Sequence, residues 1–127
     1  MKRVLVVDDE TMILTVLKQI LERLGYTVET ALDDRQALAA VRAAEAADRR
    51  FALVILDLTI PGGARATDTL RALRAVDPTI RIVASSGYVD DPVMVNPAAH
   101  GFVDRLTKPY RRAELAQLMA RLAPQTG

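Results

Sequence analysis

Several acidic, hydroxyl and ammonium side chains stand at the ends of short apolar runs. They are Asp8, Asp9 and Glu10 after RVLVV, Asp57 after FALVIL, Ser85 and Ser86 at the end of IRIVASS, and Lys108 in LTKPY. Three consecutive acids beside an apolar core repel one another, so they need a compensating cation. Carboxylate oxygens in a chain without cysteine suit a hard ion such as Mg²⁺, which usually also binds phosphate oxygens. These residue types indicate phosphate chemistry, with Asp57 as a carboxylate nucleophile that forms an aspartyl-phosphate.

The apolar runs and the stretches between them predict alternating strands and helices. Strands are expected at 3–7, 26–31, 51–56, 80–86 and 102–106. Helices are expected at 10–24 with Gly25 as C-cap, at 34–47, 68–76 and 111–123, and as a short helix within 90–101 that Pro97 limits. A turn is expected at IPGG, 60–63. This alternation implies parallel βα units, and therefore an α/β fold with one open sheet and helices on both faces.

The polar residues then meet at one edge of the sheet. The carboxyl ends of parallel strands share an edge, and ligands bind there. If the first and third strands are neighbours, Asp8, Asp9 and Asp57 converge on one crevice. Lys108 would neutralise a carboxylate there and later a phosphoryl oxygen, and Ser86 would offer a hydroxyl donor.

The composition is that of one globular domain, 1–127. Half of the 127 residues are hydrophobic and 26% are charged. The net charge of +1 gives no electrostatic case for nucleic acid or an anionic membrane. No apolar run approaches the ~18 residues of a membrane span, and VLVV is too short for a signal peptide. We therefore expect a cytoplasmic chain without an output domain, which itself contacts neither nucleic acid nor membrane.

Each of these residues also has a plainer interpretation. The acids at 8–10 would suit an exposed helix N-terminus, and Asp57 would suit a turn. The two serines could end a strand, and Lys108 could be a surface lysine. Their joint occurrence at strand ends favours a shared site. His100 is given no role, and Arg111 and Arg112 are expected on a solvated face.

Four motifs together resemble the receiver domain of two-component response regulators. They are VLVVDDE (4–10), LVILDLTIPGG (53–63), IVASSGY (82–88) and TKPY (107–110), in the family's order and spacing. The resemblance implies a flavodoxin-like (βα)5 fold with strand order 2-1-3-4-5. It also implies a phosphoacceptor that takes a phosphoryl group from a phosphohistidine with Mg²⁺ and then changes the surface around the fourth and fifth helices. Such a domain catalyses only its own phosphorylation and dephosphorylation.

The resemblance assigns roles around the phosphoryl group. Asp57 is the phosphoacceptor, and Lys108 pairs with the phosphoryl group. Ser86, which precedes Gly87, is the switch hydroxyl in preference to Ser85. Pro109 follows Lys108 through a cis peptide bond.

Further roles concern the metal and the switch. The implied Mg²⁺ ligands are Asp8, Asp9, Asp57 and the backbone carbonyl of Thr59. Thr59 and Tyr88 stand where the family varies residues that tune dephosphorylation. Arg105 replaces the family's usual aromatic residue, so a ring movement cannot carry the switch. ARAT, 64–67, replaces a more common turn sequence.

The implied partner is a histidine kinase or a histidine phosphotransfer protein. A homodimer through the fourth helix, fifth strand and fifth helix is also possible. DLTIPGG with SSGY resembles receivers of hybrid histidine kinases, so a free-standing protein and a receiver fragment of such a kinase stay open. A haloacid-dehalogenase phosphatase would need an acid where Thr59 stands, and a dinucleotide site would need a glycine-rich first turn. A receiver-like interaction module that works without phosphorylation is the remaining alternative.

Overall fold

Strands and helices alternate along the whole chain in the computed structural model, which describes residues 2–60, 62 and 65–125. The strands are β1 (Arg3–Val7), β2 (Thr27–Ala31), β3 (Leu53–Asp57), β4 (Ile82–Ser86) and β5 (Asp104–Thr107). The helices are α1 (Thr11–Arg23), α2 (Asp34–Ala46), α3 (Ala66–Val76), α4 (Pro92–Val95) and α5 (Arg112–Leu122), with a 3-10 turn η1 (Pro97–His100) after α4. The predicted order of elements is confirmed.

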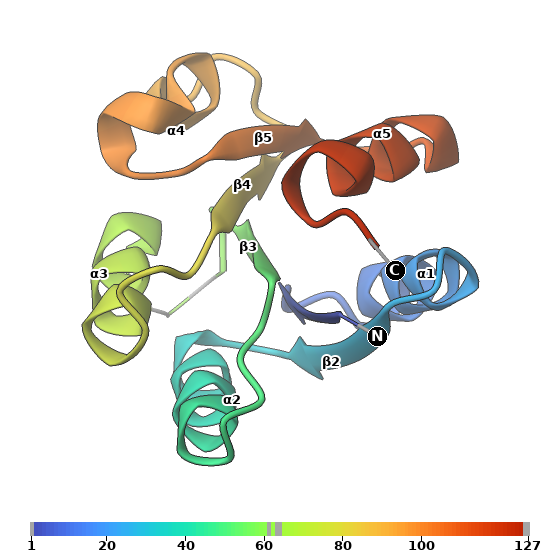
Figure 1. Cartoon of the computed structure of the whole chain (residues 1–127). Helices are drawn as coiled ribbons and strands as arrows, with labels where there is room; N and C mark the ends of the chain where they lie inside the picture. The colour runs from blue at the N-terminus through green and yellow to red at the C-terminus, as the bar shows by residue number, and fades with distance from the viewer. Residues whose placement is uncertain (1, 61, 63–64, 126–127) are drawn as a thin grey trace.

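One parallel sheet in the order β2-β1-β3-β4-β5 runs through the middle of the molecule (Figure 1). The expected strand order is therefore confirmed. β1 is hydrogen-bonded to both β2 and β3, with Val4 opposite Val28 on one side and Leu53 on the other. This order makes β1 and β3 neighbours, although a strand and two helices separate them in the sequence.

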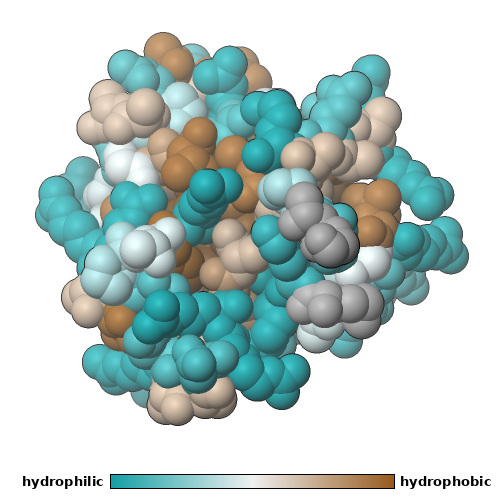
Figure 2. Space-filling model, viewed as in Figure 1, coloured by the Kyte–Doolittle hydropathy of each residue, from teal (hydrophilic) through white to brown (hydrophobic). Residues whose placement is uncertain are grey.

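Helices cover both faces of the sheet (Figure 1) and enclose two apolar cores. Val4 and Val6 of β1 pack toward α1 and α5, whereas Leu5 and Val7 pack toward α2 and α3. Alternate side chains of a strand point to opposite faces, so a strand buried on both faces is apolar throughout. Figure 2 shows hydrophobic residues in the middle of one end of the molecule, with hydrophilic residues around them.

Three strands begin two residues later than the apolar pattern predicts. Phe51, Ile80 and Phe102 precede β3, β4 and β5, and all three are buried in the core on the α2 and α3 side. The pattern at these positions reports burial and not strand pairing. Conversely, Asp57 lies inside β3 as its last residue, so the strand itself positions this carboxylate.

The segment around α4 confirms the prediction made from Pro97. α4 is a single turn that Asp91 caps by accepting a hydrogen bond from the Val93 N–H at 2.9 Å. Asn96, before Pro97, leaves the helical region with φ −141°, as proline disfavours helix at the preceding residue. Gly25 follows α1 with φ +98°, as expected for a helix C-terminus. The turn predicted at 60–63 and the ARAT segment both fall partly outside the described residues.

We expect Val83→Ala in β4 to lower the free energy of unfolding by about 2 kcal/mol, because the Val83 side chain is fully buried and its loss leaves a cavity. The matched variant Val89→Ala removes the same atoms from a residue that is 64% exposed, and should change the free energy by less than about 0.5 kcal/mol. Urea unfolding of both variants measures the difference. Equal losses would contradict the assignment of Val83 to the core.

Candidate functional site

The carboxyl ends of β1 and β3 bring two buried aspartates together. Asp57 is the last residue of β3, and Asp8 directly follows β1, where its N–H donates to the Ala31 carbonyl at 3.0 Å. The two side chains are each only 2% exposed. Two buried carboxylates repel each other and lose hydration, so the fold must supply a positive charge nearby.

Lys108, just after β5, supplies this charge. Its Nζ lies 2.8 Å from Asp8 Oδ2 and 3.4 Å from Asp57 Oδ2, and its side chain is 16% exposed. Its main-chain N–H also donates to the Ser86 carbonyl at 3.0 Å, which ties the residue to β4. These contacts bring Asp8 and Asp57 together and give Lys108 the neutralising position that the sequence predicts, whereas the predicted convergence of Asp9 with Asp57 is not among them.

Burial and the neighbouring charges change the pKa values of Asp57 and Lys108. Burial raises the pKa of the Asp57 carboxyl, the nearby Asp8 carboxylate raises it further, and the Thr59 N–H and Lys108 only partly oppose them. For Lys108, burial lowers the pKa, but the hydrogen bond to Asp8 and the attraction of Asp57 outweigh it and leave the pKa raised. The surroundings of Asp57 therefore disfavour its ionised form, and a cation close to the carboxylate would offset this cost.

Thr59 engages the other oxygen of Asp57. Its N–H donates to Asp57 Oδ1 at 3.1 Å, and its hydroxyl lies 3.2 Å from the same atom. An aspartate that bonds the backbone two residues on forms a local turn, so Asp57 orders the start of the loop after β3. Oδ1 and Oδ2 thus contact different groups, Thr59 on one side and Lys108 on the other.

The acids after β1 form a cluster that fits a hard cation. Among the described residues, oxygens of Asp8, Asp9 and Glu10 lie within 4.8 Å of one another. Asp57 is linked to this cluster through Lys108 and is not one of its members. Two carboxylates and one ammonium leave a net negative charge in a nearly dry site, and the exposed Asp9 and Glu10 add to it at the rim. Oxygen donors with excess negative charge suit Mg²⁺, and the role of Thr59 as a ligand stays a prediction.

The two serines at the end of β4 point to opposite faces of the sheet. Ser86 is fully buried, and its Oγ accepts a hydrogen bond from the Tyr88 N–H at 3.0 Å. The structure therefore places the predicted switch hydroxyl against its own loop and not against Asp57. Tyr88 itself is 65% exposed. Ser85 stands opposite Asp57 in the β3–β4 register, on the same face of the sheet.

Sequence reasoning missed the partner of Ser85, which is Tyr110. The two hydroxyls share a hydrogen bond, and Tyr110 follows the cis peptide bond between Lys108 and Pro109. Burial raises the pKa of Tyr110 to about 12, so its hydroxyl stays protonated. The sequence does show an aromatic residue two positions after Lys108. It does not show that the hydroxyl of this Tyr110 bonds to Ser85, which lies 25 residues earlier in the chain.

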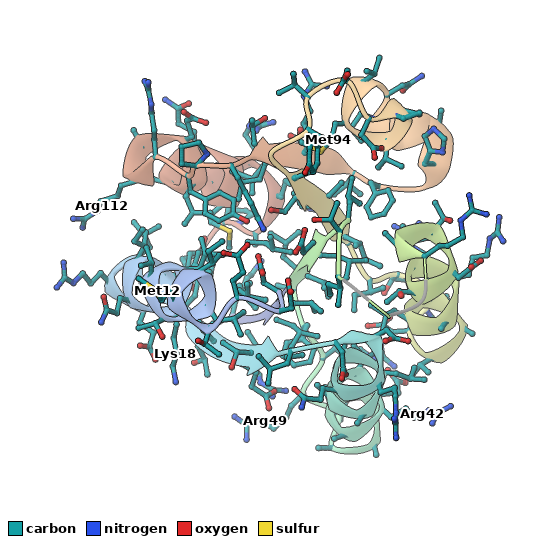
Figure 3. The ribbon with its side chains drawn as sticks, turned by 180° about the vertical axis from the view of Figure 1, so that it is seen from behind. Met12, Lys18, Arg42, Arg49, Met94 and Arg112 are labelled. Carbon is teal, nitrogen blue, oxygen red and sulfur yellow. The ribbon has the colours of Figure 1, made fainter. Side chains whose placement is uncertain are left out.

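Arg105 lies on the α4 side of β5. Its Nη1 donates to the main-chain carbonyl of Met94 in α4 at 3.1 Å. The Met94 side chain of α4 is buried against the sheet, on the opposite face from Met12 of α1 (Figure 3). The guanidinium thus connects the edge strand to α4, where the family's aromatic residue would stand.

An apolar groove of about 460 Å³ borders the site. Its lining residues are Met12, Ile13 and Val16 of α1 with Lys108, Pro109 and Tyr110 of the loop after β5. Met12 is 80% exposed and Val16 is 49% exposed, so α1 presents apolar surface to solvent here. Lys108 belongs to both the groove and the charged triad, which places this surface directly beside the buried carboxylates.

No helix in the described part of the chain has both the length and the apolar content needed to cross a membrane.

Comparison with known proteins gives relatives of one kind. The chain is 36% identical over 122 residues to the DNA-binding response regulator MtrA of Mycolicibacterium paratuberculosis, an alignment that covers 95% of this chain and 51% of MtrA. It is 34% identical to the transcriptional regulatory protein TcrA of Mycobacterium tuberculosis, over 94% of this chain and 44% of TcrA. The chain spans about half the length of the curated relatives it matches.

Solved structures show the same fold. The chemotaxis protein CheY4 of Vibrio cholerae superposes with a TM-score of 0.83 and 28% identity, covering 96% of this chain and 98% of that one. The receiver domain of a sensor histidine kinase from Pseudomonas aeruginosa, solved with a magnesium ion coordinated in its active-site cleft, has a TM-score of 0.80 and 26% identity over 95% and 96% of the two chains. The model of the response regulator receiver domain matches residues 4–120, and this chain belongs to that family.

Proposed function

We propose that Asp57 is the phosphoacceptor of this receiver domain. The observation that carries the proposal is the buried Asp57 carboxylate at the end of β3, which Lys108 links to Asp8. One carboxylate oxygen attacks the phosphorus of a phosphohistidine, an O–P bond forms, and the N–P bond to the imidazole breaks. The imidazole leaves with the electron pair of that bond and then takes a proton.

The residues around Asp57 stabilise the transferring group by position and charge. Lys108 already contacts Asp57 Oδ2, so a small movement lets its ammonium pair with a phosphoryl oxygen. Asp57 is only 2% exposed, so Lys108 and Thr59, which contact its two oxygens, must shift for attack to occur. Ser86 supplies a further donor once its Oγ leaves the Tyr88 N–H.

Asp8, Asp9 and Asp57 would hold Mg²⁺, with the Thr59 carbonyl as a fourth ligand. The acid cluster and the net negative charge of the buried triad support this assignment. When bound, the ion neutralises the carboxylates and withdraws charge from the phosphoryl oxygens. The chain's own contribution is to keep these carboxylates together at one edge of the sheet.

Dephosphorylation completes the cycle. A water oxygen attacks the phosphorus, and the bond between phosphorus and the Asp57 oxygen breaks. Asp57 is released as a carboxylate, and the protons of the water go to inorganic phosphate or to solvent. We assign Thr59 and the exposed Tyr88 to tuning this step, because one contacts Asp57 and the other stands two residues after the switch hydroxyl. The domain thus catalyses its own phosphorylation and dephosphorylation and no other reaction.

The phosphodonor is a histidine kinase or a histidine phosphotransfer protein in the cytoplasm, whether this receiver is free-standing or part of a hybrid kinase. Its phosphohistidine must come within bonding distance of Asp57, so a donor helix must rest on the adjoining surface. The groove beside Lys108 offers the apolar side chains of Met12 and Val16 for this contact. The surface of α4, β5 and α5 is left for output partners or a second copy.

Incubation with acetyl phosphate and Mg²⁺ is expected to add the mass of one phosphoryl group to the intact protein. Asp57→Asn should abolish the addition, because an amide is not a nucleophile here. The matched variant Asp90→Asn, at an exposed aspartate, should still be phosphorylated. Intact mass measured with Mg²⁺ and with EDTA tests both the residue and the metal.

An adduct that persists in Asp57→Asn would overturn the assignment. If the wild type shows no adduct, beryllofluoride binding separates fast hydrolysis from true inactivity. Absence of both would leave the interaction module that works without phosphorylation.

We expect Asp57→Asn to raise the Tm by about 2–5 °C at pH 7.5 in EDTA. Folding raises the pKa of Asp57, so the ionised carboxylate destabilises the folded state at high pH. This cost declines as the pH falls through the folded pKa and is absent below the unfolded pKa, so the advantage of the variant should shrink toward pH 4. Thermal unfolding of both proteins from pH 4 to 8 measures it, with Asp90→Asn, at an exposed aspartate, as the control.

Met12→Gln should slow phosphotransfer from a phosphorylated histidine kinase about fivefold or more, because the donor helix loses apolar contact. Phosphorylation by acetyl phosphate should stay within about twofold, since this small donor needs no groove. Val103→Gln is the matched control, because this exposed valine directly precedes β5 and Lys108 follows the other end of that strand. Equal slowing of both donors would argue against docking at the groove.

A further inference from the structure

Two buried hydroxyls beside the site are each other's hydrogen-bond partners. Ser85 is 1% exposed, and its Oγ meets the hydroxyl of the half-buried Tyr110. A buried hydroxyl without a partner costs free energy, so this pair is satisfied only while both groups stay in place. The bond joins the end of β4 to the loop after β5.

Ser85 is placed to hold both strands that carry the reacting groups. It stands opposite Asp57 in the register, and its carbonyl accepts from the Leu58 N–H at 3.0 Å. Its hydroxyl holds Tyr110, two residues beyond Lys108. One residue of β4 therefore contacts the segment after Asp57 with its main chain and the segment after Lys108 with its side chain.

The loop that carries Lys108 is fastened at two points. The Lys108 N–H donates to the Ser86 carbonyl at 3.0 Å on one side of the ammonium-bearing residue. The Ser85–Tyr110 bond holds the loop on the other side. A lysine side chain has four rotatable bonds, so its ammonium stays between two carboxylates only if its backbone is well fixed.

Packing alone does not require the Tyr110 hydroxyl. The ring borders the apolar core between α1 and α5, where phenylalanine would fill the same volume. The hydroxyl adds a directional bond to a polar residue next to Asp57. Its effect is therefore expected on the position of Lys108 more than on the burial of the ring.

We propose that the Ser85–Tyr110 hydrogen bond positions the Lys108 ammonium between Asp8 and Asp57 for phosphoryl transfer. Ser85 and Tyr110 are positioning residues and do not contact the phosphoryl group. The inference rests on the proposed function of Asp57 and adds to it a requirement for two residues that the sequence motifs do not assign.

The test compares Tyr110→Phe, Ser85→Ala and the double variant with wild type. Each single variant should lower the maximal rate of phosphorylation by acetyl phosphate about three- to tenfold. Affinity for Mg²⁺, measured by titration calorimetry, should stay within about twofold, because carboxylates bind the metal. Since both substitutions break one bond, the double variant should be no slower than the slower single variant.

A matched control separates positioning from general loss of stability. Tyr26→Phe also removes a buried hydroxyl, which donates to the Ala123 carbonyl at 2.6 Å, far from Lys108 in the fold. It should lower the Tm about as much as Tyr110→Phe and leave the phosphorylation rate unchanged. A wild-type rate in Tyr110→Phe, or multiplicative slowing in the double variant, would overturn the inference.

A second measurement does not depend on phosphorylation. In metal-free protein, the NMR signals of the Lys108 side chain should move toward those of a free lysine in Tyr110→Phe but not in Tyr26→Phe. An unchanged Lys108 signal would refute the positioning role even if the wild type proved unable to accept a phosphoryl group. If the wild type and the variants are all phosphorylated on Asp57 at the same rate, this inference is refuted and the proposed function stands.

Discussion

The contact between Lys108 and the carboxylates of Asp8 and Asp57 determines what the rest of the structure must do. Two acids are almost completely removed from water together with a largely buried ammonium, and the cost of this desolvation is partly offset where all three meet at short distance. The carboxyl ends of β1, β3 and β5, which are far apart in the sequence, must therefore lie at the same edge of the sheet. The parallel order with β1 beside β3 achieves this, because the strands share both direction and register.

Strand alternation then separates two tasks at the same edge of the sheet. Asp57 and Ser85 share the face that α1 and α5 cover, and Tyr110 meets Ser85 there. Ser86, one residue further, faces α4 with the hydroxyl bound to the Tyr88 N–H. Neighbouring serines of one strand thus face the Asp57 side and the α4 side of the sheet.

The sequence predicts the parts of this arrangement that depend on local pattern. Asp8, Asp57 and Lys108 were identifiable because each follows an apolar run, and parallel topology brings such positions together. The strand starts were not, since Phe51, Ile80 and Phe102 are buried without joining the sheet. The Ser85–Tyr110 bond and the present partner of Ser86 depend on loop paths and side-chain directions, which periodicity does not contain.

Arg105 shows how one departure from the family pattern changes the physics of a connection. A one-turn helix such as α4 has almost no internal hydrogen bonds, so contacts outside it determine its position. Three of these are the buried Met94 side chain, the Asp91 cap and the bond from Arg105 to the Met94 carbonyl. An aromatic ring at position 105 would act by filling or leaving a space. A guanidinium acts by making or breaking a directional bond, so the link between β5 and α4 here includes a polar bond from Arg105 to the helix backbone.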